Sequence, residues 1–254
     1  MQHILILFIS GVLGGIINAI AGGGGILMYP ALLAAGVAPI NANATVSFAV
    51  FPGAVSATLG YRKHLEKVAK HFLWLIVPCM LGSFFGARFL ANINPAKFAE
   101  LSPWLVLSAV ILLALQARIQ SLIVDDKRIV NTTKKIAIPL LFIMVFVLAV
   151  YGGFFGVGFG LMILVVLGFT NLKNSYELSA VKNLCGIGVS FVAASYFAAH
   201  GLLDIPSGVV VAMGTIAGGY GGSRMSQHIS SKMVHNLTVA LGLIISVVLI
   251  AKNL

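Results

Sequence analysis

The sequence predicts an all-α integral membrane protein built from two homologous halves, and three observations lead to this prediction. Hydrophobic residues make up 59% of the 254 positions and charged residues only 9%, whereas soluble domains average about 25% charged residues. An ungapped shift of 136 residues superimposes similar segments of the chain. In both copies glycine interrupts an apolar stretch at a matching place, which is typical of membrane proteins with internal repeats.

Each half contains five apolar stretches. In the first half they are 4–20, 26–38, 43–61, 72–90 and 103–118, and in the second half 136–155, 157–169, 180–199, 205–222 and 235–251. A bilayer core of about 30 Å requires about 20 helical residues, so the short second stretch of each half favours a partial or re-entrant span. We divide the chain into a first transmembrane repeat (1–117), a cytoplasmic linker (118–135) and a second repeat (136–254).

Loop charge predicts how the chain crosses the membrane. Segment 62–71 and the linker are rich in Lys and Arg, as is 223–235 to a lesser degree, so all three are expected in the cytoplasm. Segments 91–102 and 200–204 are then external. Because matching loops fall on opposite sides, each half crosses an odd number of times and the halves form an inverted repeat. Four full crossings per half would instead give a parallel repeat.

The glycine interruptions are candidate anion sites. Each glycine disfavours a helix by about 1 kcal/mol relative to alanine, so the next helix starts afresh with unpaired amides, and such an end attracts anions. Close packing of helices through small residues is the alternative, and it is the main role expected of the matching faces Gly82–Gly86 and Gly218–Gly222. The substrate contacts expected from the interruptions are Asn18, Gly22, Gly23, Gly24, Gly25, Gly158 and Gly160.

Polar residues follow the short stretch of each half at matching positions, namely Asn43, Thr45 and Ser47, and then Lys182 and Asn183. Their side chains donate hydrogen bonds to oxyanions, and Lys182 adds a positive charge. Ionisable groups within spans are costly and mark a transport pathway. Thr45 and Ser47 could instead cap a helix, and Lys182 could extend to the headgroups. As a substrate contact, Lys182 favours an anion of higher charge or one with a carboxylate.

Other functional classes lack their motifs. The sequence contains no nucleophile elbow, Walker loop or His-Glu-x-x-His motif, so we expect neither an enzyme nor a bound metal or cofactor. The net charge of +10 is explained by cytoplasmic loops rather than by nucleic-acid binding. The expected partners are a small anion and membrane lipid. A channel-like anion pathway, a subunit of a larger transport assembly and a homodimer stay open.

These segments resemble those of the TauE/SafE family of bacterial membrane transporters. The resemblance rests on Gly22–Gly25 followed by Pro30, on Ala44–Ser47, and on their second-half counterparts, and it spans nearly the whole chain. It implies a multi-pass exporter of small anions, such as sulfite or organosulfonates, in the bacterial inner membrane. The second half departs from the first, because Val166 stands where the first half has Pro30, and Val181-Lys182-Asn183 replaces the Thr-x-Ser pattern of Thr45 and Ser47. The substrate therefore stays open.

Overall fold

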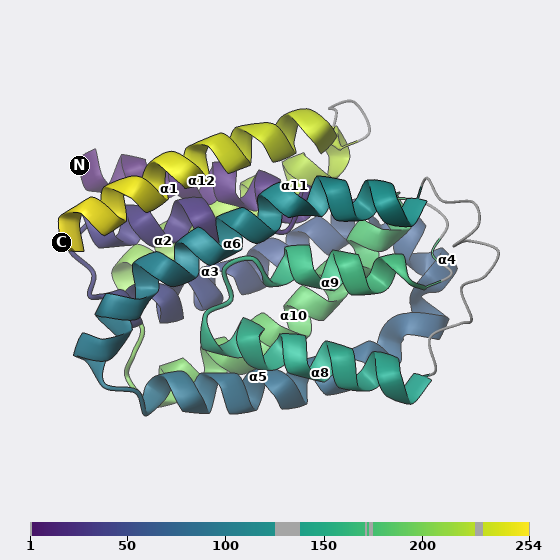
Figure 1. Ribbon diagram of the computed structural model, residues 1–254, viewed down its shortest axis with the longest axis horizontal. Coiled ribbons are helices and arrows are strands. Elements are labelled where there is room, and N and C mark those ends of the chain that lie inside the picture. The colour runs from purple at the N-terminus through teal and green to yellow at the C-terminus, as the bar shows by residue number, and fades with distance from the viewer. Residues whose placement is uncertain (1, 125–137, 171, 173–174, 227–230, 254) are drawn as a thin grey trace.

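The computed structural model describes residues 2–124, 138–170, 172, 175–226 and 231–253, and the regular secondary structure in these ranges is helical (Figure 1). The first half contains α1 (Gln2–Ile20), α2 (Gly25–Ala34), α3 (Pro39–Gly60), α4 (Arg62–Phe72), a 3₁₀ turn (Leu73–Leu75), α5 (Ile76–Ala91) and α6 (Pro95–Val124). The second half contains α8 (Ile138–Phe154), α9 (Phe159–Gly168), α10 (Ser175–Ala199), α11 (Ile205–Met225) and α12 (Ser231–Asn253).

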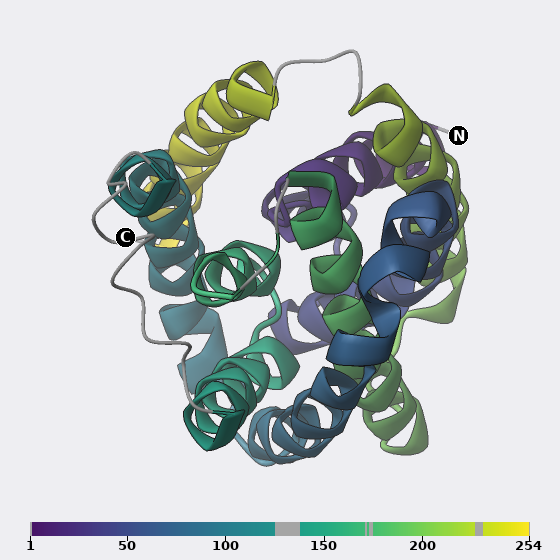
Figure 2. The same ribbon diagram turned by 90° about the vertical axis from the view of Figure 1, so that its right-hand side faces the viewer.

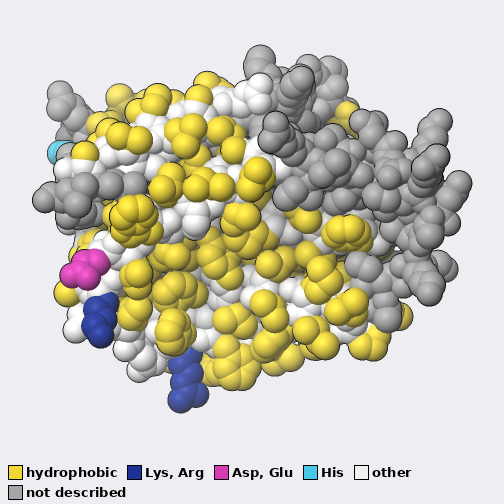
Figure 3. Space-filling view, viewed as in Figure 1, with side chains coloured by type: hydrophobic (Ala, Val, Ile, Leu, Met, Phe, Trp, Pro, Cys, Tyr) yellow, Lys and Arg dark blue, Asp and Glu magenta, His cyan; other side chains and the backbone are white. Residues whose placement is uncertain are grey.

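The helices are those of a membrane protein. Five of the described helical segments are long and apolar enough to cross a bilayer, and they are His3–Ile20, Pro39–Gly60, Leu73–Ala91, Pro95–Leu115 and Ser175–Ala199. Large apolar side chains on them face outward, including Ile4, Phe89 and Trp104. Figure 3 shows hydrophobic side chains over most of the described part of one face. An apolar surface of this extent fits lipid and not water.

The two halves interleave rather than lying side by side. In the described residues α11 packs against both α1 and α3, and its counterpart α5 packs against both α8 and α10. Figure 2 looks along the bundle and shows α6 and α12 side by side at one edge. A Cβ atom on Gly86 would lie 2.0 Å from the Val150 carbonyl oxygen, and one on Gly218 would lie 2.0 Å from the Val12 oxygen. The two glycine faces therefore pack helices closely, as predicted.

Equivalent helices run in opposite directions. Residue numbers rise together across the α1–α11, α3–α11, α5–α8 and α5–α10 contacts, so each of these pairs is parallel. By contrast, α3 and α10 are antiparallel. Asn41 near the start of α3 donates to the Leu202 carbonyl oxygen beyond the end of α10 at 3.0 Å, and the ring of His64, just past α3, lies 5.1 Å from that of Tyr176 at the start of α10. Thus α1, α3 and α11 run in one direction, and their counterparts α8, α10 and α5 run in the opposite direction.

The short elements α2 and α9 follow the glycine breaks. Each has 10 residues and is therefore about 15 Å long, half of the bilayer core. Gly22 and Gly156 follow the ends of α1 and α8 with φ values of +89° and +72°, a left-handed conformation that glycine accepts and that ends a helix. Gly158 has a φ of +87° and precedes the first residue of α9. α2 folds back along α1, since a Cβ on Gly14 would lie 2.8 Å from the Met28 side chain.

Several predicted boundaries are wrong. Segment 62–71, expected to be a loop, belongs to helix α4, where the Arg62 guanidinium donates to the Glu66 carboxylate at 2.8 Å one turn on. Its many charges hide the helix from a search for apolar stretches. Pro95 begins α6, so most of 91–102 is helical, because proline suits a first helical position. The linker's residues 118–124 are helical too, and 125–135 lie outside the described residues.

Candidate functional site

The two glycine breaks touch. A Cβ atom on Gly22 would lie 2.5 Å from the Gly160 carbonyl carbon, and one on Gly160 would lie 2.6 Å from the Gly22 Cα atom. Backbone approaches backbone here, with no flexible side chain that could move aside, so only glycine fits at either position. The interruptions of the two halves therefore meet.

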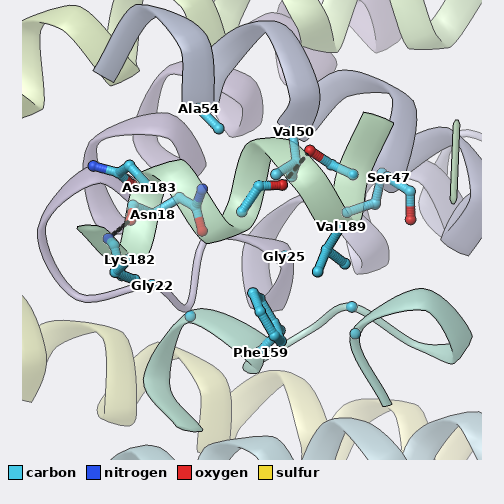
Figure 4. Close-up of a pocket in the computed structure, with 16 residues that line it drawn as sticks. Asn18, Gly22, Gly25, Ser47, Val50, Ala54, Phe159, Lys182, Asn183 and Val189 are labelled. Carbon is cyan, nitrogen blue, oxygen red and sulfur yellow. Dashed lines mark hydrogen bonds between the residues drawn. The ribbon is translucent and has the colours of Figure 1, made fainter. Parts of the chain in front are cut away.

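A small cavity of about 50 Å³ lies beside this contact, which is room for only a few water-sized groups. Figure 4 shows the residues that line it, which come from both breaks and from α3, α8 and α10. The lining comprises Asn18, Gly22, Gly25, Val46, Ser47, Val50, Ala54, Gly152, Gly156, Phe159, Gly160, Lys182, Asn183, Gly186, Val189 and Ser190. Four pairs of these positions are related by the 136-residue shift, so both halves build the cavity from equivalent parts.

Lys182 is the only charged residue in this lining, and its residue surface is 2% exposed. Its ammonium donates to the carbonyl oxygens of Asn18 and, at 2.9 Å, Ala19. These carbonyls belong to the last turn of α1, where they have no intrahelical partner and carry the negative end of the helix dipole. An ammonium has three donors, so one remains for the cavity. Lys182 is buried and does not extend to the headgroups, so that alternative is wrong.

Unpaired amides complete the polar side of the cavity. Gly25 and Gly160 line the cavity, and their N–H groups have no hydrogen-bond acceptor among the described residues. Both lie at the start of a short helix, where four amides lack partners inside the helix. The Gly22 amide differs, because it donates to the Ile17 carbonyl oxygen at 3.0 Å. The side chains of Asn18 and Asn183 add amide groups at the same place.

Five expected contacts do not border the cavity, namely Gly23, Gly24, Gly158, Asn43 and Thr45. The Asn43 side-chain amide donates to the Phe154 carbonyl oxygen at 2.9 Å, and the Thr45 hydroxyl accepts from the Asp204 amide at 3.0 Å. Thr45 lies two residues from Ser47, which turns it to the opposite side of the helix. Gly24 packs against Gly14, where a Cβ would lie 2.0 Å from the Gly14 oxygen.

Other lining residues escaped the sequence analysis. α3 and α10 start at Pro39 and Ser175, before their predicted starts at 43 and 180, and no side chain caps α3. Thr45 and Ser47 therefore do not cap it. From Ser47 the cavity face continues to Val50 and Ala54, and from Asn183 it continues through Gly186 to Ser190. Spacings of three and four residues mark one helix face, and this signal could have located them.

Fold and cavity together define a polytopic, all-helical membrane protein whose two halves line a small cavity with one buried lysine. The family model for the sulfite exporter TauE/SafE matches residues 7–249, which is nearly the whole chain. The protein belongs to this family and is a membrane transporter.

Relatives with curated names agree with this assignment. The chain is 29% identical to a "Probable membrane transporter protein" of Haemophilus influenzae over 87% of this chain and 84% of the relative. It is 28% identical to the "Probable membrane transporter protein YfcA" of Escherichia coli K12, over 98% of this chain and 88% of the relative. A Sinorhizobium relative, ORF9, is 28% identical over 98% and 93% respectively. No solved structure matches the chain.

Proposed function

We propose that the protein is a secondary transporter that carries small anions, among them sulfite or organosulfonates, through this cavity across the bacterial inner membrane. The single observation that carries the proposal is the uncompensated charge of Lys182. Among the described residues, no carboxylate lies within ion-pair distance of its ammonium, and carbonyl dipoles alone hold it in place.

An anion in the cavity would supply the missing charge. A buried charge is costly unless it is paired and hydrogen-bonded, and an ionisable group inside the membrane marks a transport pathway. Lys182, with its free donor, and Gly25 and Gly160, with their unpaired amides, line the same cavity. Asn18 and Asn183 lie beside them. The Asn183 amide also donates to the Ala19 carbonyl oxygen at 3.5 Å. An oxyanion is a ligand that accepts hydrogen bonds from donors of these kinds.

The direction of the helices supports an inverted repeat. Three helix pairs are related by the 136-residue shift, namely α1 with α8, α3 with α10 and α5 with α11, and the two helices of each pair run in opposite directions. The expected repeats 1–117 and 136–254 would therefore have opposite orientations in the membrane. The short, folded-back α2 and α9 support re-entrant elements that bring helix starts to the cavity. In such transporters the two halves exchange conformations around a fixed site, so that the cavity opens to each side in turn.

The test is anion counterflow in proteoliposomes that contain the purified protein. Lys182→Gln removes the charge while keeping hydrogen-bonding capacity, and Lys97→Gln removes an exposed lysine of α6 as the matched control. A hydrogen bond to a charged group contributes about 1.5–3 kcal/mol, so Lys182→Gln is expected to weaken anion affinity about 10-fold to 100-fold. Lys97→Gln is expected to behave like the unaltered protein.

The same assay separates the alternatives. Anion on the opposite side should accelerate uptake if the protein is a carrier. Conductance without this acceleration would indicate a channel, and a requirement for added ATP and a further protein would indicate a subunit of a larger assembly. Equal anion affinities of the Lys182 and Lys97 variants would refute the role given to Lys182.

A further inference from the structure

The two ends of the cavity differ in chemistry. Figure 4 shows Lys182, Asn18 and Asn183 together at one side, whereas Val50 and Val189 lie toward the other. Val46, Ala54 and Phe159 add further apolar surface to the lining. An anion held by Lys182 therefore faces an aliphatic and aromatic wall, not a second set of charged groups.

The hydroxyls of the lining do not change this picture. The Ser47 hydroxyl donates to the Asn43 carbonyl oxygen at 3.2 Å, and the Ser190 hydroxyl donates to the Gly186 oxygen at 2.6 Å. Each hydroxyl has one proton, so both protons are already engaged. The Gly156 amide is engaged as well, because it donates to the Tyr151 carbonyl oxygen at 3.4 Å. Ser47, Ser190 and Gly156 therefore offer no free donor to a second anionic group.

The chemical difference between the two sides of the cavity arises at one pair of equivalent positions. Val46 and Lys182 are equivalent under the 136-residue shift, and both border the cavity. Only the second half therefore places a cation there. Two lysines would suit a ligand with an anionic group at each end, whereas one lysine opposite a valine suits a ligand with one anionic group.

We propose that the cavity selects monoanions that carry a short aliphatic tail, with the oxyanion head at Lys182 and the tail against Val50 and Val189. The head is a sulfonate or a carboxylate, since both groups carry one negative charge shared among oxygen atoms that accept hydrogen bonds. This inference rests on the proposed anion transport and names its substrate class. It reverses the expectation that Lys182 favours an anion of higher charge, because a second negative group would meet apolar side chains.

The test compares two series of anions by the thermal stabilisation they give the detergent-purified protein. The sulfonate series is methanesulfonate, ethanesulfonate, propanesulfonate and the dianion sulfoacetate. The carboxylate series is acetate, propionate, butyrate and the dianion succinate. Each added methylene is expected to tighten binding about fourfold until the cavity is full, and each dianion is expected to bind at least about tenfold more weakly than the longest monoanion of its series.

Val46→Lys provides a second measurement, with Val46→Met as a control of similar side-chain length and no charge. The lysine variant is expected to raise the affinity for sulfoacetate and succinate relative to propanesulfonate and butyrate by about tenfold or more. The methionine variant adds no charge and should therefore not raise these ratios. A folded lysine variant with unchanged ratios would count against the proposal.

The outcomes separate the two proposals. If no anion stabilises the protein and Lys182→Gln has no effect on counterflow, the proposed function itself fails. If anions bind through Lys182 but affinity is independent of tail length, or if the dianions bind as tightly as the monoanions, anion transport stands and the selection for a tailed monoanion is refuted. A chain-length dependence in either series supports the proposal for that head group.

Discussion

Gly160→Ala is expected to push the two glycine breaks apart and to impair transport. The added Cβ atom would lie 2.6 Å from the Gly22 Cα atom and 2.7 Å from its carbonyl oxygen. An ordinary contact begins at 3.4 Å, so the backbones must separate by about 0.8 Å. Overpacking of this kind costs about 1–3 kcal/mol, which lowers the unfolding temperature by about 2–12 °C in a chain of this size.

Three further glycines separate the sources of this cost. A Cβ atom at position 36 would meet no atom within 4 Å, but Gly36 has a φ of +89°. Gly36→Ala therefore tests backbone strain alone, which is expected to cost about 1–2 kcal/mol. Gly22→Ala combines that strain with the contact, and its effect should approach the sum of those at Gly36 and Gly160. Gly221 lies in α11 with open space around it, and alanine there should leave stability unchanged or slightly raised.

The measurement is the unfolding midpoint of detergent-purified variants at a fixed heating rate, together with anion counterflow. Gly160→Ala should lose transport, because the Gly160 amide and the cavity wall move together, whereas Gly221→Ala should retain it. If the Gly160 variant unfolds and transports like the Gly221 variant, the backbone contact between the breaks is not as tight as described, and the placement of the amide donors is wrong.

Two other predictions concern positions away from the cavity. Asp204 accepts a hydrogen bond from the Ser207 amide at 3.0 Å at the start of α11, so Asp204→Ala should lower stability by about 1 kcal/mol in the same unfolding assay, and an unchanged midpoint would show that this cap is dispensable. Cys79 and Cys185 are fully buried, so a maleimide should label neither thiol in the folded protein and both after denaturation. Labelling of the folded protein would contradict the packing of α5 against α10.

The polar residues of the site illustrate the limit of sequence reasoning. Gly25, Gly160, Ser47, Lys182 and Asn183 were predicted and do border the cavity. Asn43 and Thr45 have similar donors and neighbouring positions, yet they bond to Phe154 and Asp204. A helix that starts four residues earlier than predicted changes which residues reach the cavity. Pro39 at the first position of α3 is a local signal for that start. The partners of Asn43 and Thr45 have no local signal, because they lie more than 100 residues away.

The amino-acid sequence alone determined that the chain is a helical membrane protein with two related halves, each broken by glycine. These properties follow from apolar composition and from the poor helix propensity of glycine, which act locally. The tertiary structure decided that Gly22 meets Gly160 and that Lys182 is held by the end of α1. It also decided which side of the cavity is apolar. These features depend on how helices from both halves pack, and packing joins residues that are distant in the chain.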